Sequence, residues 1–327
     1  MTVRLPADWE PHERCLMCWP GREALPGAPA PQAIADFALI ARTIARFEPV
    51  LMLAQPGFAE HARAECGPDV EVAELEFDDV WIRDSGPVFV VRDGAELVVV
   101  DFRFNLWGSR TVPRERYAGT GRLLAERLGL ARQEAPFVLE GGAVSSDGRG
   151  TLIAVEPSIV NKNRNPGATR ADLEEAFAAF LGIERTIWLE HGLAEDGTDG
   201  HADNVAVFVG PGQVLCQAVP DARDPNAARM TANRAALEGA GLELLDLPAL
   251  PYSELGGRRI ARSYLNSFVG NGCVVVPVSG GSADAEGQAA LRDAFPGREI
   301  VGVPGETLSR AGGGVHCITQ QQPLLAP

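Results

Sequence analysis

One order of secondary-structure signals recurs along this chain of 327 residues: a helix, a strand, a short polar or glycine-rich motif, and a hairpin. Apolar residues at helical spacing predict the helices, short apolar runs predict the strands, and Asp-Gly or similar pairs predict the hairpin turns. These turns fall near positions 93, 147, 210 and 270, which are 54, 63 and 60 residues apart. A period near 60 residues indicates a fold assembled from equivalent α/β units.

Each of these units contains a predicted helix followed by a strand. The helices are expected over Ala33 to Phe47, Arg122 to Leu128, Arg170 to Leu181 and Asn226 to Leu237. The strands are expected over Val50 to Ala54, Phe137 to Leu139, Thr186 to Leu189 and Leu242 to Leu247. A fifth unit would combine the C-terminal helix and strands with the N-terminal segment around Cys15 to Trp19, and so close a ring. An ordinary open α/β sheet is the alternative, because it also alternates strands and helices.

Composition and charge disfavour several classes of protein. The chain is 46% hydrophobic, but its longest apolar runs are strand-sized and its first twenty residues lack a signal-peptide core. We therefore expect a soluble, cytoplasmic protein without a membrane partner. With 29 Lys and Arg against 44 Asp and Glu, the net charge of -15 disfavours nucleic acid and favours cationic partners. The six cysteines, including the Cys15 and Cys18 pair, are expected to be reduced core residues.

A short polar or glycine-rich cluster precedes each hairpin, where an apolar strand would be expected to continue. The clusters are WIRDSGP (81–87), LEGGA (139–143), DGTDGHADN (196–204), SYLNSF (263–268) and GGGVHC (312–317). One marker from each, Asp84, Glu140, His201, Asn266 and Cys317, gives gaps of 56, 61, 65 and 51 residues. Because this spacing follows the structural period, units arranged around one axis would bring the clusters into one pocket.

Such a pocket would hold a thiol, at least one imidazole and three carboxylates. Cys317 is the natural nucleophile, and the glycines at 312 to 314 would let backbone and substrate approach closely. His201 could transfer protons to a leaving amine, with Glu140 orienting its ring. Taken one at a time, each of these side chains also has a purely structural reading as a buried cysteine or a loop histidine.

The carboxylates suit a planar cation better than a metal. Asp84 and Asp203 could each accept paired N–H donors from a guanidinium. A divalent cation on these acids, Asp199 and His201 is the competing reading, but neither His-x-x-x-His nor paired cysteine spacing is present. We therefore expect no metal and no cofactor, although surface solvation remains the plain alternative for either aspartate alone.

Five motifs in order, WIRDSGP, LEGGA, NKNRNP (161–166), DGHADN and GGGVHCITQQQP, resemble those of the agmatine deiminases. The resemblance runs from the N-terminal EPHERCLMCWP to the end of the chain. That family belongs to the guanidino-group modifying enzymes of pentein fold, a five-bladed pseudo-symmetric α/β propeller with a central active site. The resemblance therefore implies one catalytic domain over residues 1–327, built of about five ββαβ-type modules. It also implies hydrolysis of agmatine to N-carbamoylputrescine and ammonia without metal or organic cofactor.

The same resemblance implies a role for each site residue. Cys317 would form the amidino-cysteine intermediate. Asp84 and Asp203 would hold the guanidinium, while His201, supported by Glu140, would be the general acid and base. The expected substrate-binding residues are Trp81, Asp196, Asp199, Asn266 and Gly314. The expected partner is a small cationic guanidinium compound, and a homodimer is the assembly considered.

Departures from the family pattern leave the substrate open. Many relatives carry an acidic residue four positions before the motif histidine, whereas this chain has Gly197 there, with Asp196 and Asp199 beside it. Arg103, in a segment that lacks the usual tryptophan, or Arg110 could receive a carboxylate. Deimination of free or peptidyl arginine is therefore an alternative. So are an amidinotransferase, a non-catalytic polyamine-binding module and a metal-dependent ureohydrolase.

Overall fold

The computed structural model describes residues 2–21, 25, 29–109, 119–255 and 257–325. Strands of this part of the chain form five mixed sheets of three or four strands and one two-stranded hairpin. Four of the mixed sheets share one connectivity. An antiparallel hairpin is followed by a helix, and then by a strand that pairs in parallel with the second hairpin strand. The helix is needed because parallel neighbours require a long crossover.

The bounds of these four modules follow the chain order. The first contains β5 (Val88–Arg92), β6 (Glu96–Arg103), α4 (Thr120–Leu128) and β7 (Ala131–Val138). The second contains β8 (Val144–Ser146), β9 (Thr151–Val155), α5 (Glu156–Ile159), α6 (Arg170–Leu181) and β10 (Arg185–Leu189). The third contains β11 (Ala206–Gly210), β12 (Gln213–Gln217), α7 (Ala227–Gly239) and β13 (Glu243–Leu247). The fourth contains β16 (Phe268–Gly270), β17 (Cys273–Val278), α8 (Ala283–Ala294) and β18 (Glu299–Pro304).

The fifth module joins the two ends of the chain. Strand β19 (Gln320–Pro323) pairs antiparallel with β2 (His12–Cys18), with Gln321 opposite Cys15. Helix α1 (Ala30–Ala45) then leads to β3 (Val50–Ala54), which pairs in parallel with β2, and α2 (Ala59–Cys66) leads to β4 (Glu71–Glu74). This pairing confirms that the two ends of the chain meet in one unit, but the predicted share of the C-terminal segment was too large, because α8 and β18 belong to the fourth module. A closed ring and a single catalytic domain stay our predictions, and the pairing supports both.

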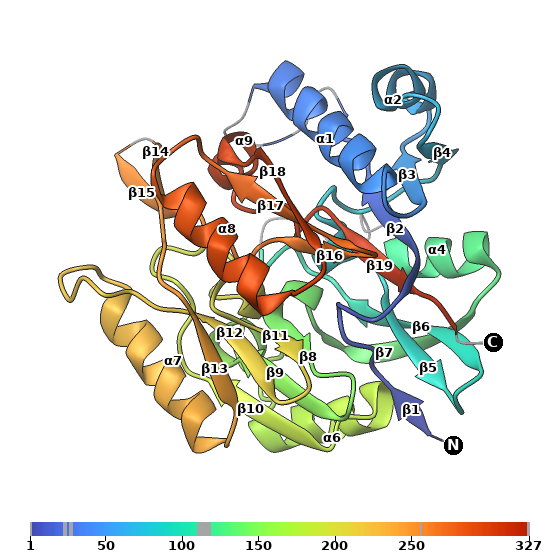
Figure 1. The fold of residues 1–327 in the computed structure, drawn as a ribbon. Helices are drawn as coiled ribbons and strands as arrows, with labels where there is room; N and C mark the ends of the chain where they lie inside the picture. Colours follow the sequence, from blue (N-terminus) through green and yellow to red (C-terminus); the bar gives the residue numbers. More distant parts are fainter. Residues whose placement is uncertain (1, 22–24, 26–28, 110–118, 256, 326–327) are drawn as a thin grey trace.

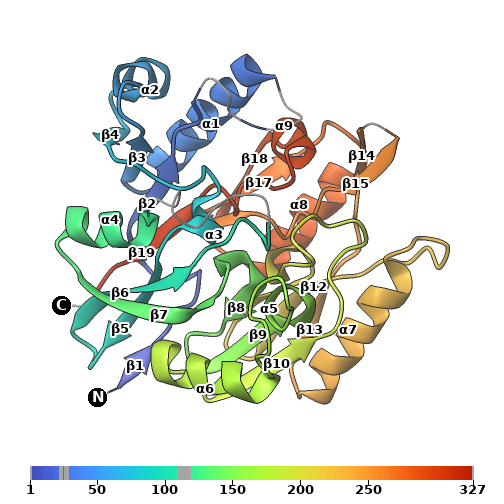
Figure 2. The same ribbon diagram turned by 180° about the vertical axis from the view of Figure 1, so that it is seen from behind.

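The long helices α1, α6, α7 and α8 lie on the outside of the molecule, and the sheets of three or four strands lie further inside (Figures 1 and 2). All five residues of β3 are buried, and Val98 to Val100 in the middle of β6 are fully buried. Helix α1 buries Phe37, Ile40 and Ile44 along one stripe, at the spacing that places side chains on a single face. The strands are thus covered on the outside by amphipathic helices, which leaves their polar end segments to form a site.

Short helical turns occupy the motif segments just before the hairpins. They are α3 (Ile82–Ser85), η2 (Gly141–Ala143) and η3 (Ala202–Asn204). A further short helix, α9 (Glu306–Arg310), ends before the glycines that precede Cys317. The packing of α3 on η2, and of η2 on η3, brings three of the motifs together. The expectation that the polar clusters interrupt the strands is therefore confirmed.

The predicted elements differ from the observed ones mainly at their ends. The strand expected over Phe137 to Leu139 is the end of the longer β7, because the polar residues at its start pair with β6. The hairpin of β14 (Tyr252–Leu255) and β15 (Arg258–Ala261) was not predicted, since its short charged strands lack an apolar pattern. Strand β1 (Val3–Arg4), which adds to β5, was missed for the same reason. Among the described helices, none is both long and apolar enough to cross a membrane.

Candidate active site

Cys317 meets two of the other clusters. It follows the Gly312 to Gly314 segment, and the residue is only 6% exposed. Its Sγ lies 3.2 Å from Nδ2 of Asn266 and 3.6 Å from Oδ2 of Asp203. The backbone N–H of Cys317 also donates to Oδ1 of Asn266 at 3.3 Å. Asn266 thus positions both the backbone and the thiol of the predicted nucleophile.

Asp84 is held in a fixed orientation by donors from two other segments. It is buried in the single turn of α3. Its Oδ1 accepts from the backbone N–H of Gly142 at 2.9 Å, and its Oδ2 accepts from Nε1 of Trp107 at 2.9 Å. Nδ1 of His201 lies 3.8 Å from the same Oδ2. The carboxylate is therefore fixed beside the imidazole.

Glu140 orients His201 as expected from the sequence. Its Oε2 lies 3.1 Å from Nε2 of His201, and both side chains are buried. Arg164 holds the other side of the carboxylate, with Nε 2.6 Å from Oε1 and Nη2 3.2 Å from Oε2. Since a carboxylate accepts hydrogen bonds, Nε2 of His201 is protonated and Nδ1 faces Asp84. Arg164 comes from the NKNRNP motif, whose function the sequence alone did not indicate.

Asp203 has one occupied and one free oxygen. It lies in η3, two residues after His201, and is almost fully buried. Its Oδ2 is 2.9 Å from Nδ1 of His316. Its Oδ1 is buried without a hydrogen-bond partner in the described parts of the chain. A buried carboxylate oxygen that lacks a donor is costly, so this atom is suited to accept from a bound N–H group.

The backbone at Gly142 passes through the middle of this group. A Cβ added there would lie 2.6 Å from Nδ1 of His201, 2.9 Å from Oδ2 of Asp203 and 3.0 Å from Oδ1 of Asp84. Real Cβ atoms do not approach other atoms this closely. Glycine in the LEGGA motif therefore allows three ionisable side chains to converge.

Burial and like charges keep the predicted nucleophile protonated. Burial is the largest effect on Cys317, and the carboxylates of Asp203 and Asp84 add to it, so the pKa of the thiol is raised well above its ordinary value. Burial also raises the pKa of Asp84. A positive charge placed between these carboxylates would offset them and favour the thiolate.

The imidazole of His201 is charged at neutral pH. Burial opposes its protonation, but the carboxylates of Asp84, Glu140 and Asp203 outweigh burial and raise its pKa to about 10. For Asp203, burial favours the neutral acid, but the hydrogen bond and charge of His316 outweigh it and lower the pKa of Asp203. The site thus holds a proton donor next to an ionised carboxylate.

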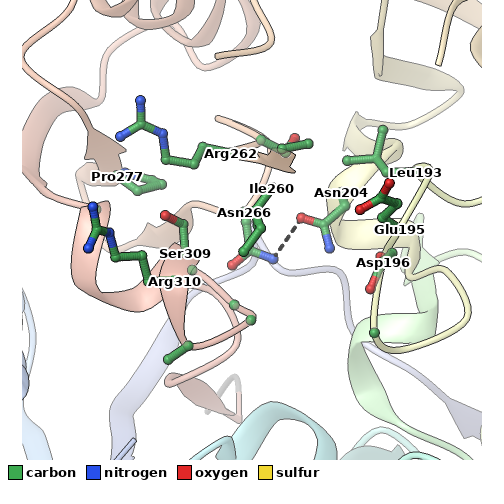
Figure 3. Close-up of a pocket in the computed structure, with 18 of the residues that line it drawn as sticks. Leu193, Glu195, Asp196, Asn204, Ile260, Arg262, Asn266, Pro277, Ser309 and Arg310 are labelled. Atoms are coloured by element: carbon green, nitrogen blue, oxygen red, sulfur yellow. Dashed lines mark hydrogen bonds between the residues drawn. The ribbon is translucent and has the colours of Figure 1, made fainter. Parts of the chain in front are cut away.

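A pocket of about 310 Å³ has Asn266 and Gly314 on its wall (Figure 3). Cys317 does not line this pocket itself, but its Sγ contacts Asn266. Asn266 and Asn204 contact each other at 3.4 Å, as the dashed line shows. Asp196 lies on the opposite side in this view, with Arg262 and Arg310 across from it. The Oδ1 of Asp196 accepts from the N–H and hydroxyl of Thr198, and its Oδ2 has no partner among the described residues.

The structure places the predicted substrate-binding residues in different surroundings. Asp196, Asn266 and Gly314 line the pocket. Trp81 is buried against Gly313, where an added Cβ would lie 2.4 Å from its ring.

Asp199 is engaged elsewhere. Its Oδ2 accepts from Nη1 of Arg164 at 2.8 Å and from Nδ2 of Asn163 at 2.9 Å, and it does not line the described pocket wall. We therefore assign it to the support of Arg164 rather than to the substrate. Arg103 lines a different pocket, and Arg110 lies outside the described residues.

Three residues that contact the site were given no function by the sequence: Trp107, Arg164 and His316. Trp107 has a φ of 52°, in the left-handed region, and it precedes Gly108. The sequence feature that could have indicated Trp107 as a site residue is an indole next to a glycine in a polar segment. His316 was noted only as a neighbour of Cys317 in sequence, although its ring bonds to Asp203.

Among the described residues, no group of three or more His, Cys, Asp or Glu side chains could hold a metal ion. All six cysteines are buried and free in this part of the chain. The acids of the site are instead bonded to Arg164, His201, His316, Trp107 and backbone N–H groups.

Known proteins resemble this chain over its full length. The profile of the family described as Porphyromonas-type peptidyl-arginine deiminase matches residues 4–323. A putative agmatine deiminase of Streptomyces coelicolor is 40% identical over 342 residues, covering 99% of both chains. An agmatine deiminase of Pseudomonas aeruginosa is 39% identical over 350 residues, covering 98% of this chain and 95% of the relative.

A solved structure of the agmatine deiminase of Enterococcus faecalis has a TM-score of 0.93 with this chain. It is 27% identical in sequence and covers 99% of this chain and 97% of its own. These similarities confirm the predicted α/β pentein class and the predicted kinship with guanidino-group modifying hydrolases. The chain belongs to the Porphyromonas-type peptidyl-arginine deiminase family.

Proposed function

We propose that this protein hydrolyses agmatine to N-carbamoylputrescine and ammonia through a covalent intermediate on Cys317. The observation that carries the proposal is the pair of buried carboxylates beside the thiol. Sγ of Cys317 lies 3.6 Å from Asp203, whose Oδ1 is buried without a partner among the described residues. A guanidinium ion is planar, cationic and rich in N–H donors, so it fits between Asp203 and Asp84.

Binding of this cation also activates the nucleophile. The negative charges of Asp203 and Asp84 raise the pKa of Cys317 in the free protein. A guanidinium placed between them offsets both charges and favours the thiolate next to the carbon it attacks. The nucleophile is therefore formed in the presence of substrate, which protects it from other electrophiles.

The thiol of Cys317 loses its proton to solvent as the guanidinium binds. In the first half-reaction the thiolate sulfur attacks the central carbon of the guanidinium, and the C–S bond forms. His201, protonated because its pKa is raised to about 10, donates its proton to the departing nitrogen. Ammonia leaves, and a cationic amidino-cysteine remains between Asp84 and Asp203, which stabilise its charge.

In the second half-reaction the neutral His201 takes a proton from water. The hydroxyl oxygen bonds to the same carbon, and the C–S bond breaks with its electron pair returning to sulfur. The sulfur takes up the remaining hydroxyl proton as the neutral ureido product leaves. Glu140 keeps the ring of His201 in one orientation through both steps, and Arg164 keeps Glu140 in place. One imidazole is thus general acid and then general base.

The pocket beside the nucleophile supports agmatine over arginine. The free oxygen of Asp196 on its wall suits the distal ammonium of an extended diamine. A substrate carboxylate would need an available cation, but Glu306 already pairs with Arg262 at 2.5 Å and with Arg310 at 2.8 Å. Relatives that are 39% and 40% identical over nearly the whole chain carry the agmatine deiminase name, one of them as putative.

Ammonia release in the presence of agmatine, arginine or an arginine-terminated peptide tests this function. We expect agmatine to be the best of the three and Cys317→Ser to lower the rate by at least a factor of about ten, since an alkoxide forms far less readily than a thiolate. A Cys317→Ser variant that retains more than a tenth of the rate would remove Cys317 from the nucleophile role.

Three further arms separate the rival functions. Dialysis against EDTA should leave the rate unchanged, whereas loss and recovery with manganese would indicate a metal-dependent ureohydrolase. An added amine that appears in the product would indicate an amidinotransferase. Agmatine that binds but stays intact would indicate a polyamine-binding module.

A further inference from the structure

The site described above leaves a second polar cluster unexplained, in which three of the four residues are buried. It lies behind Asp203, on the side away from the free Oδ1, and consists of Asp8, Arg83, His316 and Gln321. These residues come from the N-terminal segment, the RDSGP motif and the C-terminal GGGVHCITQQQP motif. A small cavity of about 50 Å³ has all four residues on its wall. The four do not contact the 310 Å³ pocket in which the substrate is placed.

His316 is bonded to a carboxylate at each ring nitrogen. Nδ1 lies 2.9 Å from Oδ2 of Asp203, and Nε2 lies 2.9 Å from Oδ2 of Asp8. Both carboxylates accept hydrogen bonds, so both nitrogens of His316 must carry a hydrogen, and the ring is an imidazolium. The ring is buried, whereas the side chain of Asp8 is 40% exposed. The charge of His316 is thus supported from both sides.

Asp8 is itself held in place. Its Oδ1 accepts from Nε2 of Gln321 at 2.7 Å, and Oε1 of Gln321 accepts from Nη2 of Arg83 at 2.7 Å. The backbone N–H of Arg83 donates to the carbonyl of Cys317 at 3.2 Å. The cluster is therefore connected at one end to the segment of the nucleophile and at the other to the guanidinium-binding carboxylate.

The hydrogen bond from His316 affects both the orientation and the charge of Asp203. The bond to His316 uses Oδ2 and leaves Oδ1 free, which is the oxygen needed by a guanidinium. A cation at this distance also stabilises the ionised carboxylate in a buried place, where it would otherwise tend to be neutral. Without Asp8, the imidazolium would lose one of its two acceptors, and Asp203 would lose part of this support.

We propose that Asp8 is a positioning residue that acts through His316 to keep Asp203 ionised and its Oδ1 directed at the substrate. This inference rests on the proposed function, because Asp203 is assigned there to the guanidinium. Asp8 touches neither Cys317 nor the pocket, so its effect on the reaction would be indirect. The charged or titratable groups that face Asp203, His316 and Asp8 are Arg83, Asp84, His201, Cys317 and His12.

The test compares Asp8→Asn, His316→Gln and the partial restoration Asp8→Glu over a range of pH. For Asp8→Asn we expect kcat/KM for agmatine to fall at least about ten-fold at neutral pH, mostly through KM, since ground-state binding of the guanidinium weakens. The acid limb of kcat/KM should move to higher pH, because an Asp203 that has lost part of its support is protonated more easily. Asp8→Glu should move this limb part of the way back.

Asp284→Asn is the matched control. Asp284 is a buried aspartate that accepts from the hydroxyl of Tyr264 at 2.7 Å and from the backbone N–H of Ser279 at 3.0 Å, and its hydrogen bonds do not involve Asp8, Asp203 or His316. Rates are compared at equal amounts of folded protein, measured by circular dichroism. We expect Asp284→Asn to lower the melting temperature without moving the acid limb.

The outcomes separate this inference from the function. If wild type releases no ammonia from agmatine, the proposed function is wrong. If wild type is active while Asp8→Asn and His316→Gln keep the wild-type KM and acid limb, the positioning role is wrong and the cluster is structural. A loss of melting temperature with an unmoved limb in Asp8→Asn contradicts the proposal equally.

Discussion

At the scale of single residues, the pKa of the nucleophile depends on whether a cation is bound next to it. Cys317 is buried next to Asp203 and Asp84, whose charges raise the pKa of its thiol. Without a bound cation to offset these charges, Cys317 is a poor nucleophile. The same charges make the site a good receptor for a cation, so binding and activation come from one pair of residues.

Asp203→Asn tests the contribution of charge to binding. The substitution keeps the size of the side chain but removes its charge and reverses one hydrogen-bonding group. A charge-assisted hydrogen bond contributes about 1.5 to 3 kcal/mol, which corresponds to a loss of kcat/KM of about ten-fold to over a hundred-fold. Agmatine should protect Cys317 of wild type from iodoacetamide and protect the variant poorly. If Asp203→Asn kept a near-normal kcat/KM and full protection by agmatine, Asp203 would have a structural role only.

The same variant should make the free thiol more reactive. Since the charge of Asp203 raises the pKa of Cys317, its removal lowers that pKa, and the thiolate forms at lower pH. The pH profile of alkylation without substrate should therefore shift to lower pH in Asp203→Asn, although turnover falls. The alkylation rate of wild type should still rise at alkaline pH at which an ordinary thiol is already ionised, because the pKa of Cys317 is raised by burial and by these carboxylates. An unchanged or upward-shifted profile would show that Asp203 does not control the thiol.

The residues that perform the chemistry could be predicted from the sequence more easily than the residues that hold them in place. Cys317 and His201 belong to residue types with few uses in such a pocket, and their spacing follows the structural period. Arg164 and His316 act by contacts between segments far apart in sequence, at separations of 24 and 113 residues from their partners. No pattern within one motif shows which partner in another motif a side chain meets.

At the scale of elements, the single-turn helices decide where the reactive groups lie. The motif turn η2 brings the backbone N–H of Gly142 to 2.9 Å from Asp84, and η3 carries Asp203. A regular strand in these places would direct alternate side chains away from the pocket. Helix α6 has the bounds that the sequence predicted, and the structure adds a capping box between Thr169 and Asp172 at its N-terminus. The hairpin β14–β15 was missed because its strands are short and charged.

Gly142→Ala tests the close approach at η2. The added methyl would lie 2.6 Å from Nδ1 of His201, so the turn or the imidazole must move. We expect kcat to fall by at least about a hundred-fold, since a displacement of this order misplaces the catalytic groups. Gly239→Ala is the control, because a Cβ there meets nothing within 4 Å and the residue is exposed at the end of α7. If Gly142→Ala kept the wild-type kcat, the turn would be able to shift without any effect on the reaction.

At the scale of the whole molecule, the arrangement depends on pairing between the two ends of the chain. Strand β19 follows Cys317 by two residues and pairs with β2 near the N-terminus. This long-range pairing could be predicted only from the period, since neither strand alone shows where its partner lies. The same closure brings Asp8 next to His316, over a separation of 308 residues.

The net charge of -15 provides the last prediction, because it acts on the substrate before any contact forms. Agmatine carries a guanidinium and an ammonium, so the field of the protein raises its local concentration and favours its binding. Salt screens interactions beyond about 10 Å at 0.1 M ionic strength, but it hardly affects the buried carboxylates at Cys317. Raising sodium chloride from about 10 mM to about 500 mM should therefore raise KM several-fold and leave kcat nearly constant. Choline chloride should have the same effect if the cause is screening rather than a specific ion. A KM that does not depend on either salt would mean that the acidic surface serves solubility alone, and a fall in kcat would mean that salt reaches the buried site.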